Sequence, residues 1–585
     1  MGMLRYRGSW LVGLASGAAA VLPGTMVSAQ QPALPTTILP DVRLQDIPSV
    51  SPPAQAPQLS IPSGGPTAAP EGAEAIRFRL TALSIEGVSA YPADRFAALS
   101  DPLLNTDVSL AQLYQLASEI QQAYREDGYF LTRVIVPQQT IADGHFRIQV
   151  VEGFINGIEV DGDVGAVEEL IREYLSNVVD RRPIRLRTLE RYLLLCNDIP
   201  GINVQGVLRA SKQELGAAQL VARVGRKPFD ALILVDNYAD QYTGNWQTAA
   251  AVASNSLTSL GEQLSVTGLL TRPFSDPFNL YNNQNNQWVT QFNSSWRLGG
   301  DGLFAETLFA YGNSRPGFVL KDFDFDSTTL LLNFDVGYPF YRTRDFSLTT
   351  RFGFTFENLD TDIFGNERFT RDRIRVLYLD NQIQHRDAWR GSNRLNFGVR
   401  QGIPVFNATE KGSSYKSRED GTNNETVLLG TVSRQQPVYD GFEVLNRPAA
   451  VSVFGSVSGQ AALFNSLLAD ELFSLGGPPY GWGYDQGELS GDSGVGAAGE
   501  LQFTQQLNLP YFESYQIFGF YNYGRVWNRN GGGDEDLSSA GGGIRVSVLK
   551  AMTMDLTVAK PLTLKSERSS FGKDPQVLFR VVNRF

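Results

Sequence analysis

Residues 346–357 read FSLTTRFGFTFE and alternate between two kinds of side chain. The even-numbered positions are mostly aromatic or aliphatic, whereas the odd-numbered positions carry serine, threonine, arginine, glycine and glutamate. A period of two predicts a β-strand with one apolar and one polar face. Residues 288–298 repeat the pattern, with Trp288, Phe292 and Trp296 on one face. Such a face is either the core of a soluble sandwich or the lipid-facing surface of a membrane barrel, and the pattern alone leaves both open.

The C-terminal stretch favours the barrel. Val577, Phe579, Val581 and Phe585 share one face of a last alternating strand. Residues 229–585 provide about 15 to 18 strands if each strand with its connection takes roughly 20 to 24 residues. We therefore expect residues 228–585 to form a transmembrane antiparallel β-barrel of about 16 strands. A terminal phenylalanine on such a strand resembles the signal that bacterial outer-membrane barrels present to the barrel-assembly machinery, which implies that Phe585 is a C-terminal assembly signal.

Two similar segments precede this region, at residues 76–152 and 153–227. In the first, a strand ends at Gly87, an apolar helical face runs through residues 109–127, Gly128 closes that helix, and two strands follow. In the second, residues 158–162 mirror residues 83–87 at an offset of 75, and Gly201 stands where Gly128 stood. An internal repeat of this length predicts two copies of one small α+β domain with the order β-α-α-β-β.

The N-terminus predicts export. Arg5 and Arg7 precede an apolar stretch over residues 10–21, and Val27-Ser28-Ala29 forms a small-residue cleavage pattern. We expect a signal peptide at residues 1–29 rather than a membrane anchor, because the apolar stretch is short and Pro23-Gly24 interrupts it. Residues 30–75 are dense in proline, alanine, serine, glutamine and glycine, a composition that cannot build a core and predicts an extended linker.

Composition excludes several classes of function. The 585 residues include 1 Cys and 2 His, which argues against zinc sites and a histidine-based triad, so we predict no metal, no cofactor and no enzyme activity. Cys196 stands among leucines and is interpreted as a buried apolar residue. A net charge of −11 argues against binding to nucleic acid. The 57 glycines and 35 phenylalanines are typical of a membrane barrel, although a large soluble β protein has a similar composition.

Two stretches carry a family resemblance. Residues 128–137 read GYFLTRVIVP and residues 150–153 read VVEG. With the signal peptide, the linker, the two repeats and the barrel, residues 76–585 resemble the two-partner secretion transporters of the haemolysin secretion/activation family. The resemblance implies that the repeats are polypeptide-transport-associated (POTRA) domains in the periplasm. It also implies a pore in the bacterial outer membrane, in contact with its lipid, that exports an unfolded exoprotein passenger captured in the periplasm.

The resemblance also implies a site inside the barrel. Family members fold a long loop into the lumen with a Val-Arg-Gly-Tyr/Phe tip, which corresponds here to Gly481, Trp482, Gly483 and Tyr484. The family's arginine pairs with the acidic residue of a Phe-x-Asp-x-Gly pattern on the barrel wall, which corresponds here to Phe520, Asn522 and Gly524. Neither position of the family's ion pair carries a charge in this sequence. Losing both charges together avoids leaving one enclosed charge unpaired, which would cost roughly 3 to 5 kcal/mol of folding free energy. We hypothesise that Trp482 packs or hydrogen-bonds near Asn522; the alternative is an exposed loop aromatic.

Other interpretations remain open from sequence alone. A barrel assembly or insertion factor of the same superfamily is the main alternative, although such proteins usually carry more than two repeats. A passive porin explains the barrel but not the repeats, and no catalytic constellation supports an enzyme. The glycine runs at residues 531–533 and 541–543 are interpreted as turns or close strand approaches rather than phosphate-binding loops. Family members also have an N-terminal helix that plugs the pore. The resemblance gives little support for such a helix in this chain, since only residues 39–47 could form a short one.

Overall fold

The computed structural model describes residue 44 and residues 47–51, 59–60, 68–92, 94–141, 143–211, 214–273, 286–529, 533–549, 551–563 and 574–585. The predicted signal peptide and most of the predicted linker lie outside these residues. Among the residues described, no helix is both long and apolar enough to cross a membrane.

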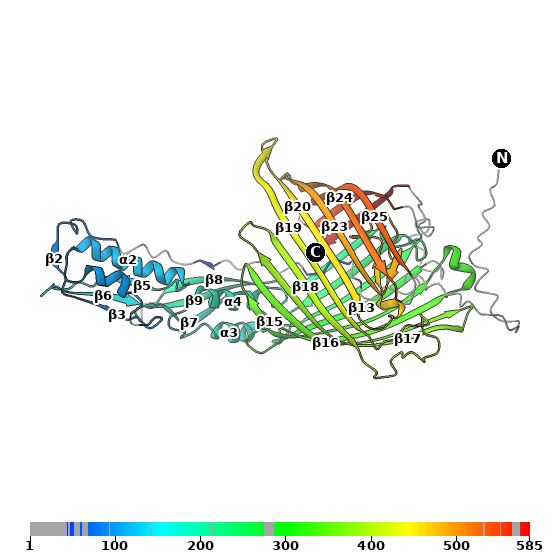
Figure 1. Ribbon diagram of the computed structural model, residues 1–585, viewed down its shortest axis with the longest axis horizontal. Coiled ribbons are helices and arrows are strands. Elements are labelled where there is room, and N and C mark those ends of the chain that lie inside the picture. The colour runs from blue at the N-terminus through cyan, green and yellow to red at the C-terminus, as the bar shows by residue number, and fades with distance from the viewer. Residues whose placement is uncertain are drawn as a thin grey trace. The chain divides into compact units, whose positions relative to one another are not determined.

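The C-terminal part is a closed antiparallel barrel of 16 strands, in which β10 pairs with β27 to complete the wall (Figure 1). The strands are β10 (Phe229–Asp236), β11 (Trp246–Asn255), β12 (Gln263–Arg272), β13 (Asn286–Leu298), β14 (Leu303–Arg315), β15 (Asp326–Arg342), β16 (Phe346–Ile363), β17 (Glu367–Arg386), β18 (Ser392–Gly402), β19 (Thr426–Val444), β20 (Arg447–Ala462), β23 (Ser493–Gln506), β24 (Phe512–Trp527), β25 (Asp534–Val548), β26 (Met552–Pro561) and β27 (Gln576–Arg584). The predicted barrel of about 16 strands is therefore confirmed.

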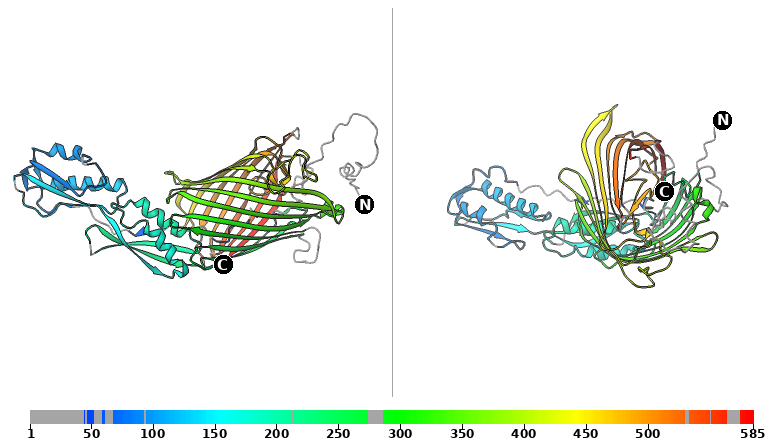
Figure 2. Two further views of the ribbon diagram at one scale, coloured as in Figure 1. Left: turned by 90° about the horizontal axis from the view of Figure 1, so that it is seen from below. Right: turned by 45° about the vertical axis from the view of Figure 1, so that its right-hand side comes forward.

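The alternation seen in the sequence separates the inside of the wall from the outside. On β16, Phe352 is 57% exposed on the outer face, whereas Leu359 packs with Ile374 and Val376 of β17 against Leu468, which lies on a loop inside the barrel. The aromatic face is therefore the outer surface of a barrel rather than the core of a sandwich. Figure 2 shows the strands lying side by side around the closed wall.

The first repeat contains a sheet of β3 (Ala82–Glu86), β6 (His145–Val151) and β5 (Arg133–Ile135), and a short pair of β2 (Arg77–Arg79) and β4 (Asp107–Ser109). Helix α1 (Ala97–Ser100) is a single turn, and α2 (Leu110–Glu126) supplies most of the apolar face that packs on the sheet. A capping box between Ser109 and Gln112 begins α2. Gly128, with φ +88°, follows the end of the helix, as the sequence predicts.

The second repeat consists of β7 (Phe154–Gly162), α3 (Glu168–Ser176), α4 (Leu186–Asn197), β8 (Ile202–Ala210) and β9 (Ala217–Arg226). Equivalent glycines support the internal repeat. A Cβ on Gly87 would lie 2.2 Å from Val150 O, and a Cβ on Gly162 would lie 2.3 Å from Val224 O. Both positions need glycine because their φ angles, +83° and +109°, and the adjacent backbone leave no room for a side chain.

Two features differ from the sequence prediction. The strand expected to run to Gly87 is divided into β2 and β3, because Leu80 between them is fully buried and turns into the core. The Pro-rich stretch is not free of packing either. Leu59 and Ser60 form β1, which pairs in parallel with β8, and Leu44 is buried against inward-facing residues of the barrel. A few apolar residues in a proline-rich segment are enough for it to pack where another part of the chain already provides a strand edge or an apolar wall.

The second repeat contacts one end of the barrel, which we call the repeat rim; the opposite end is the far rim. Arg342 of β15 makes two hydrogen bonds of 2.7 Å with the Asp198 carboxylate at the end of α4. Arg191 of α4 donates to Pro339 O at 2.8 Å and forms an ion pair with Asp301 at 3.3 Å. The turns between β13 and β14 and between β15 and β16 therefore lie at the repeat rim.

Candidate functional site: the lumenal loop

Residues 463–492 connect β20 to β23 from the far rim and fold into the barrel; we call this segment the lumenal loop. Its centre is a hairpin of β21 (Phe473–Leu475) and β22 (Leu489–Gly491). Leu475, Tyr484 and Leu489 pack against two wall residues, Val526 and Leu537. The hairpin is therefore held by apolar contacts with β24 and β25.

The tip of the loop lies against the wall residues that the sequence singles out. The Trp482 ring lies 5.6 Å from the Phe520 ring and 5.7 Å from the Tyr238 ring, between centroids. The Gly483 N–H donates to Ser539 Oγ at 3.1 Å, and Ser539 Oγ donates to Asn522 Oδ1 at 2.7 Å. Trp482 and Asn522 therefore lie on the same side of the lumen, but the polar link runs through Gly483 and Ser539 rather than through the indole.

Glycines make this close approach possible. A Cβ on Gly483 would lie 2.7 Å from Pro561 N, and a Cβ on Gly524 would lie 2.5 Å from Leu475 Cδ2. Gly496 on β23 leaves room for the Tyr480 ring in the same way. Real Cβ atoms do not approach other heavy atoms this closely, so these positions fix how deeply the hairpin sits on the wall.

Tyr484 fastens the tip to the far rim of the last strands. Its side chain is 3% exposed. The hydroxyl lies within hydrogen-bond distance of two carbonyl oxygens, Ser538 O at 3.0 Å and Thr563 O at 2.9 Å, and accepts the Thr563 N–H at 3.1 Å. A phenol that is both donor and acceptor therefore joins the loop to β25 and to the connection that follows β26.

The glycine run at residues 541–543 serves the neighbouring wall. These glycines lie inside β25, and a Cβ on Gly541 or Gly543 would come within 2.8 Å of the Phe520 or Phe518 ring. The run is therefore a close approach within the wall, as the sequence analysis favoured. Phe518 and Phe520 occupy the space that the missing side chains leave, which positions Phe520 under Trp482.

An ion pair that no sequence pattern indicates holds the base of the loop. Arg418 Nη1 lies 2.5 Å from Asp492 Oδ1, and Asp492 also accepts the backbone N–H groups of Leu467 at 2.7 Å and Arg529 at 2.9 Å. The Asp492 side chain is fully buried, and that of Arg418 is 12% exposed. Asp492 stands at the end of the motif stretch, but its partner lies 74 residues away in the chain, on a connection that no local pattern links to it.

Phe585 lies where the barrel closes. Its N–H donates to Ala231 O at 2.9 Å, and Lys227 Nζ donates to Phe585 O at 2.9 Å. The side chain is 59% exposed at the repeat rim. Its predicted role as an assembly signal therefore falls on an accessible side chain beside the seam between β10 and β27.

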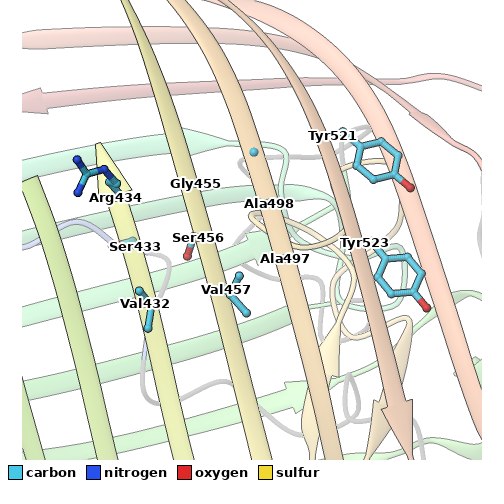
Figure 3. Close-up of a pocket in the computed structure, with 11 residues that line it drawn as sticks. Val432, Ser433, Arg434, Gly455, Ser456, Val457, Ala497, Ala498, Tyr521 and Tyr523 are labelled. Atoms are coloured by element: carbon cyan, nitrogen blue, oxygen red, sulfur yellow. The ribbon is translucent and has the colours of Figure 1, made fainter. Parts of the chain in front are cut away.

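Three further features lie outside the lumenal loop: the acidic and histidine side chains, Cys196 and a groove on the outer face. Among the residues described, no group of three or more His, Cys, Asp and Glu side chains could hold a metal ion. Cys196 is fully buried, and burial raises the pKa of its thiol. A groove of about 330 Å³ lies on the outer face of β19, β20, β23 and β24, where Val457 and Tyr521 point away from the lumen (Figure 3). Small residues in its floor, including Gly455 and Ala497, account for the groove.

Comparisons with known proteins identify both parts of the chain. Residues 78–153 match the POTRA domain, ShlB-type, and residues 219–546 match the haemolysin secretion/activation protein ShlB/FhaC/HecB. The heme/hemopexin transporter protein HuxB of Haemophilus influenzae (strain 86-028NP) is 24% identical over 80% of each chain. The outer membrane transporter CdiB of Dickeya dadantii is 22% identical over 80% of this chain and 79% of its own. The structure of CdiB from Escherichia coli superposes with a TM-score of 0.71 at 18% identity, covering 90% of this chain and 94% of that one.

Proposed function

The chain belongs to the haemolysin secretion/activation family of outer-membrane two-partner secretion transporters, and we propose that its periplasmic repeats capture an unfolded exoprotein that then threads through the barrel lumen. Family members transport partner exoproteins and are not enzymes. The proposed division is a signal peptide at residues 1–29, a linker at 30–75, POTRA domains at 76–152 and 153–227, and the barrel at 228–585. The repeat rim is then periplasmic and the far rim extracellular.

One observation supports the capture step: the β8 edge of the second repeat pairs with an extended segment of the chain. Leu59 and Ser60 pair with Gly206 and Val207, and Leu59 packs against the repeat's apolar core. A strand added in this way is held by main-chain hydrogen bonds, which place few demands on sequence. An unfolded passenger would bind such an edge by the same interaction.

The lumenal loop is proposed to control passage. Its tip and its base are fixed to the wall by Tyr484 and Asp492, so the loop occupies lumen that a passing chain would need. A second segment also lies on the inner wall: Ser51 Oγ donates to Asp230 Oδ2 at 2.6 Å and accepts from Gln263 Nε2 at 2.8 Å. Threading would displace one or both. No nucleotide-binding motif is evident, so folding of the passenger outside the cell would supply the driving force.

The test compares secretion with barrel assembly. We expect a strain that lacks this protein to retain its passenger, a large secreted protein encoded nearby, while the abundance of unrelated outer-membrane barrels stays unchanged. Normal passenger levels in the medium would contradict export. A general loss of unrelated barrels would instead favour the assembly factor. A second proposed contact, between Phe585 and the barrel-assembly machinery, predicts that Phe585→Ser lowers the amount of this barrel in the membrane.

A further inference from the structure

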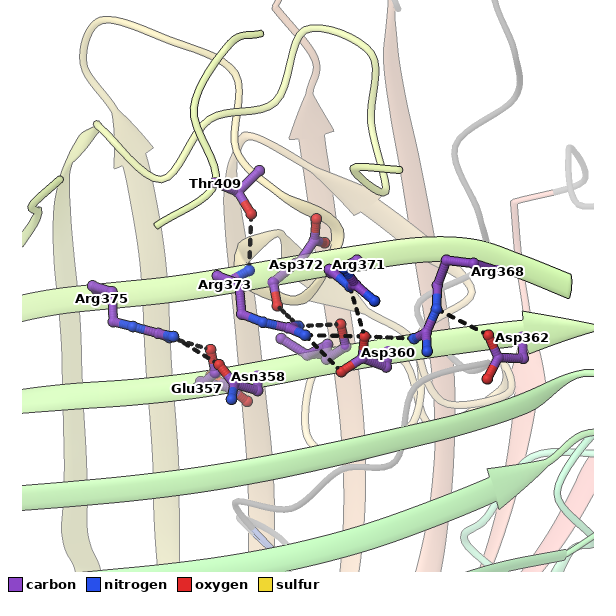
Figure 4. A network of polar contacts seen from close by, with 11 residues as sticks. Glu357, Asn358, Asp360, Asp362, Arg368, Arg371, Asp372, Arg373, Arg375 and Thr409 are labelled. Carbon is purple, nitrogen blue, oxygen red and sulfur yellow. Dashed lines mark hydrogen bonds and ion pairs between the residues drawn. The ribbon is translucent and has the colours of Figure 1, made fainter. Parts of the chain in front are cut away.

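A cluster of arginines lies on the outer face of the barrel at the extracellular end of β16 and β17. Leu359 and Ile374 face the lumen, because both pack on Leu468 of the lumenal loop. Side chains alternate along a strand, so the positions between them face outward. The outward set at this end comprises Asn358, Asp360, Asp362, Arg368, Arg371, Arg373 and Arg375 (Figure 4).

These charges begin where the apolar surface ends. Phe352 is 57% exposed and Phe406 is 68% exposed on the outside of the wall, and the Phe406 ring lies 6.4 Å from the ring of Phe356. Phe356 is the register partner of Arg375, whose Cζ lies 3.6 Å from the centroid of the Phe356 ring. Outer-membrane barrels place an aromatic girdle at the boundary between hydrocarbon and headgroups. The arginines beyond it therefore lie at the level of the outer-leaflet headgroups.

The cluster has more cations than its carboxylates neutralise. Asp360 is shared by three arginines, at 2.5 Å from Arg368, 3.2 Å from Arg371 and 2.9 Å from Arg373. Asp362 adds one contact with Arg368 at 3.0 Å. Four arginines thus face two carboxylates on a chain whose net charge is −11. The side chain of Arg371 is 51% exposed, so part of this positive charge is accessible.

We propose that this arginine cluster binds the phosphates of a phosphorylated glycolipid of the outer leaflet, a lipid of the lipopolysaccharide type. Guanidinium groups remain charged and match phosphate oxygens in a bidentate geometry. Arg371 is half exposed, so its guanidinium can reach a phosphate directly, while the acyl chains of the same lipid lie along Phe352 and Phe406. The guanidinium of Arg373 is held by Asp360 and by two carbonyl oxygens, and it adds positive charge beside Arg371. A lipid with a phosphorylated headgroup matches both features of this surface, because its phosphates meet the arginines and its acyl chains meet the aromatic band. An acidic polypeptide would match the arginines alone.

The test uses the full-length protein in detergent freed of native lipid, with native mass spectrometry to count bound bisphosphorylated lipid A. The variant Arg368→Gln/Arg371→Gln/Arg373→Gln should bind roughly a hundredfold more weakly, and Arg371→Gln alone roughly fivefold more weakly. Arg390→Gln is the matched control, since Arg390 also pairs with one aspartate, Asp440, but in a periplasmic turn. The control should bind as the wild type does.

Two further comparisons make the result decisive. Lipid A without phosphates should bind the wild type as weakly as bisphosphorylated lipid A binds the triple variant. Equal binding of both lipids, or equal binding by wild type and the arginine variants, would overturn the proposal and leave the cluster as a self-contained ion-pair network. Displacement of bound lipid A by an acidic peptide at equal concentration would also overturn it. If the triple variant fails to migrate as a folded barrel in an unboiled gel, the single variant Arg371→Gln decides.

Discussion

At the scale of the residue, the contact between Gly483 and the wall decides whether the loop tip can dock. A Cβ at this position would meet Pro561 N at 2.7 Å and the carbonyl carbon of Lys560 at 2.9 Å, and both are backbone atoms that cannot rotate away. Gly483→Ala should therefore lift the tip from Ser539 at a cost of roughly 1 to 3 kcal/mol. The expected result is a higher channel conductance in planar bilayers.

The control for this variant is Gly268→Ala in β12, because a Cβ on Gly268 meets nothing within 4 Å. Its conductance should match that of the wild type. An unchanged conductance in Gly483→Ala, together with normal folding, would mean that the tip does not restrict the lumen.

Asp492 gives a second prediction at this scale. Asp492→Asn removes the charge that compensates Arg418, and a buried charge left unpaired costs roughly 3 to 5 kcal/mol. We expect the base of the lumenal loop to open and external protease to cleave residues 463–492 faster. Asp440→Asn breaks an exposed pair with Arg390, which solvent screens, and should leave both stability and cleavage unchanged. Equal protection in Asp492→Asn and wild type would contradict the anchoring role.

At the scale of the element, Glu152 joins the end of the first repeat's sheet to the segment after β3. Its carboxylate accepts the N–H groups of Ser89 and Ala90, each at 2.8 Å, and the Tyr124 hydroxyl at 2.7 Å. Burial by itself would raise the pKa of the Glu152 carboxyl, but the hydrogen bonds from Ser89, Tyr124 and Ala90 outweigh burial and hold that pKa below its ordinary value.

The lowered pKa predicts how the stability of the first repeat depends on pH. Because the unfolded chain takes up the proton first, the stabilisation is complete above the ordinary pKa of about 4.3 and is lost as the pH falls through the lower folded value. Hydrogen exchange at residues 88–91, corrected for intrinsic rates, should accelerate over that acidic window. Glu152→Gln should abolish the pH dependence, whereas Glu159→Gln, which alters an exposed pair with Arg209, should retain it. Persistence of the pH dependence in Glu152→Gln would assign it to another group.

Sequence periodicity predicted the elements because each one has its pattern in adjacent residues. Helix α2 has a cap, an apolar stripe and a closing glycine within 20 residues, and β16 alternates over residues 346–357. The pairing of β1 with β8 had no such pattern, since two residues in a proline-rich stretch show no period. The outward arginines were also hidden, because a register shift between Thr361 and Asp362 determines which residues of the hairpin share a face.

At the scale of the whole molecule, closure of the barrel created the contacts that no local pattern could predict. The pair of Arg418 and Asp492, and the contact of Trp482 with Phe520, join segments that only the closed wall brings together. The tip and its wall partners were predicted only from the family resemblance. The route of the polar link through Ser539 follows from the register of β24 with β25, in which Asn522 pairs with Ser539.

The most direct test of passage through the lumen uses neighbouring positions on β13. Asn293 faces the lumen, where its amide donates to Gln291 Oε1 at 3.2 Å, whereas Phe292 is 39% exposed on the outer face. A photocrosslinking amino acid is placed at either position while a passenger is arrested in transit by a stably folded domain at its C-terminus. We predict a passenger adduct at position 293 and none at position 292. An adduct at position 292 alone, or at neither position while the arrested passenger spans the membrane, would contradict threading through this barrel.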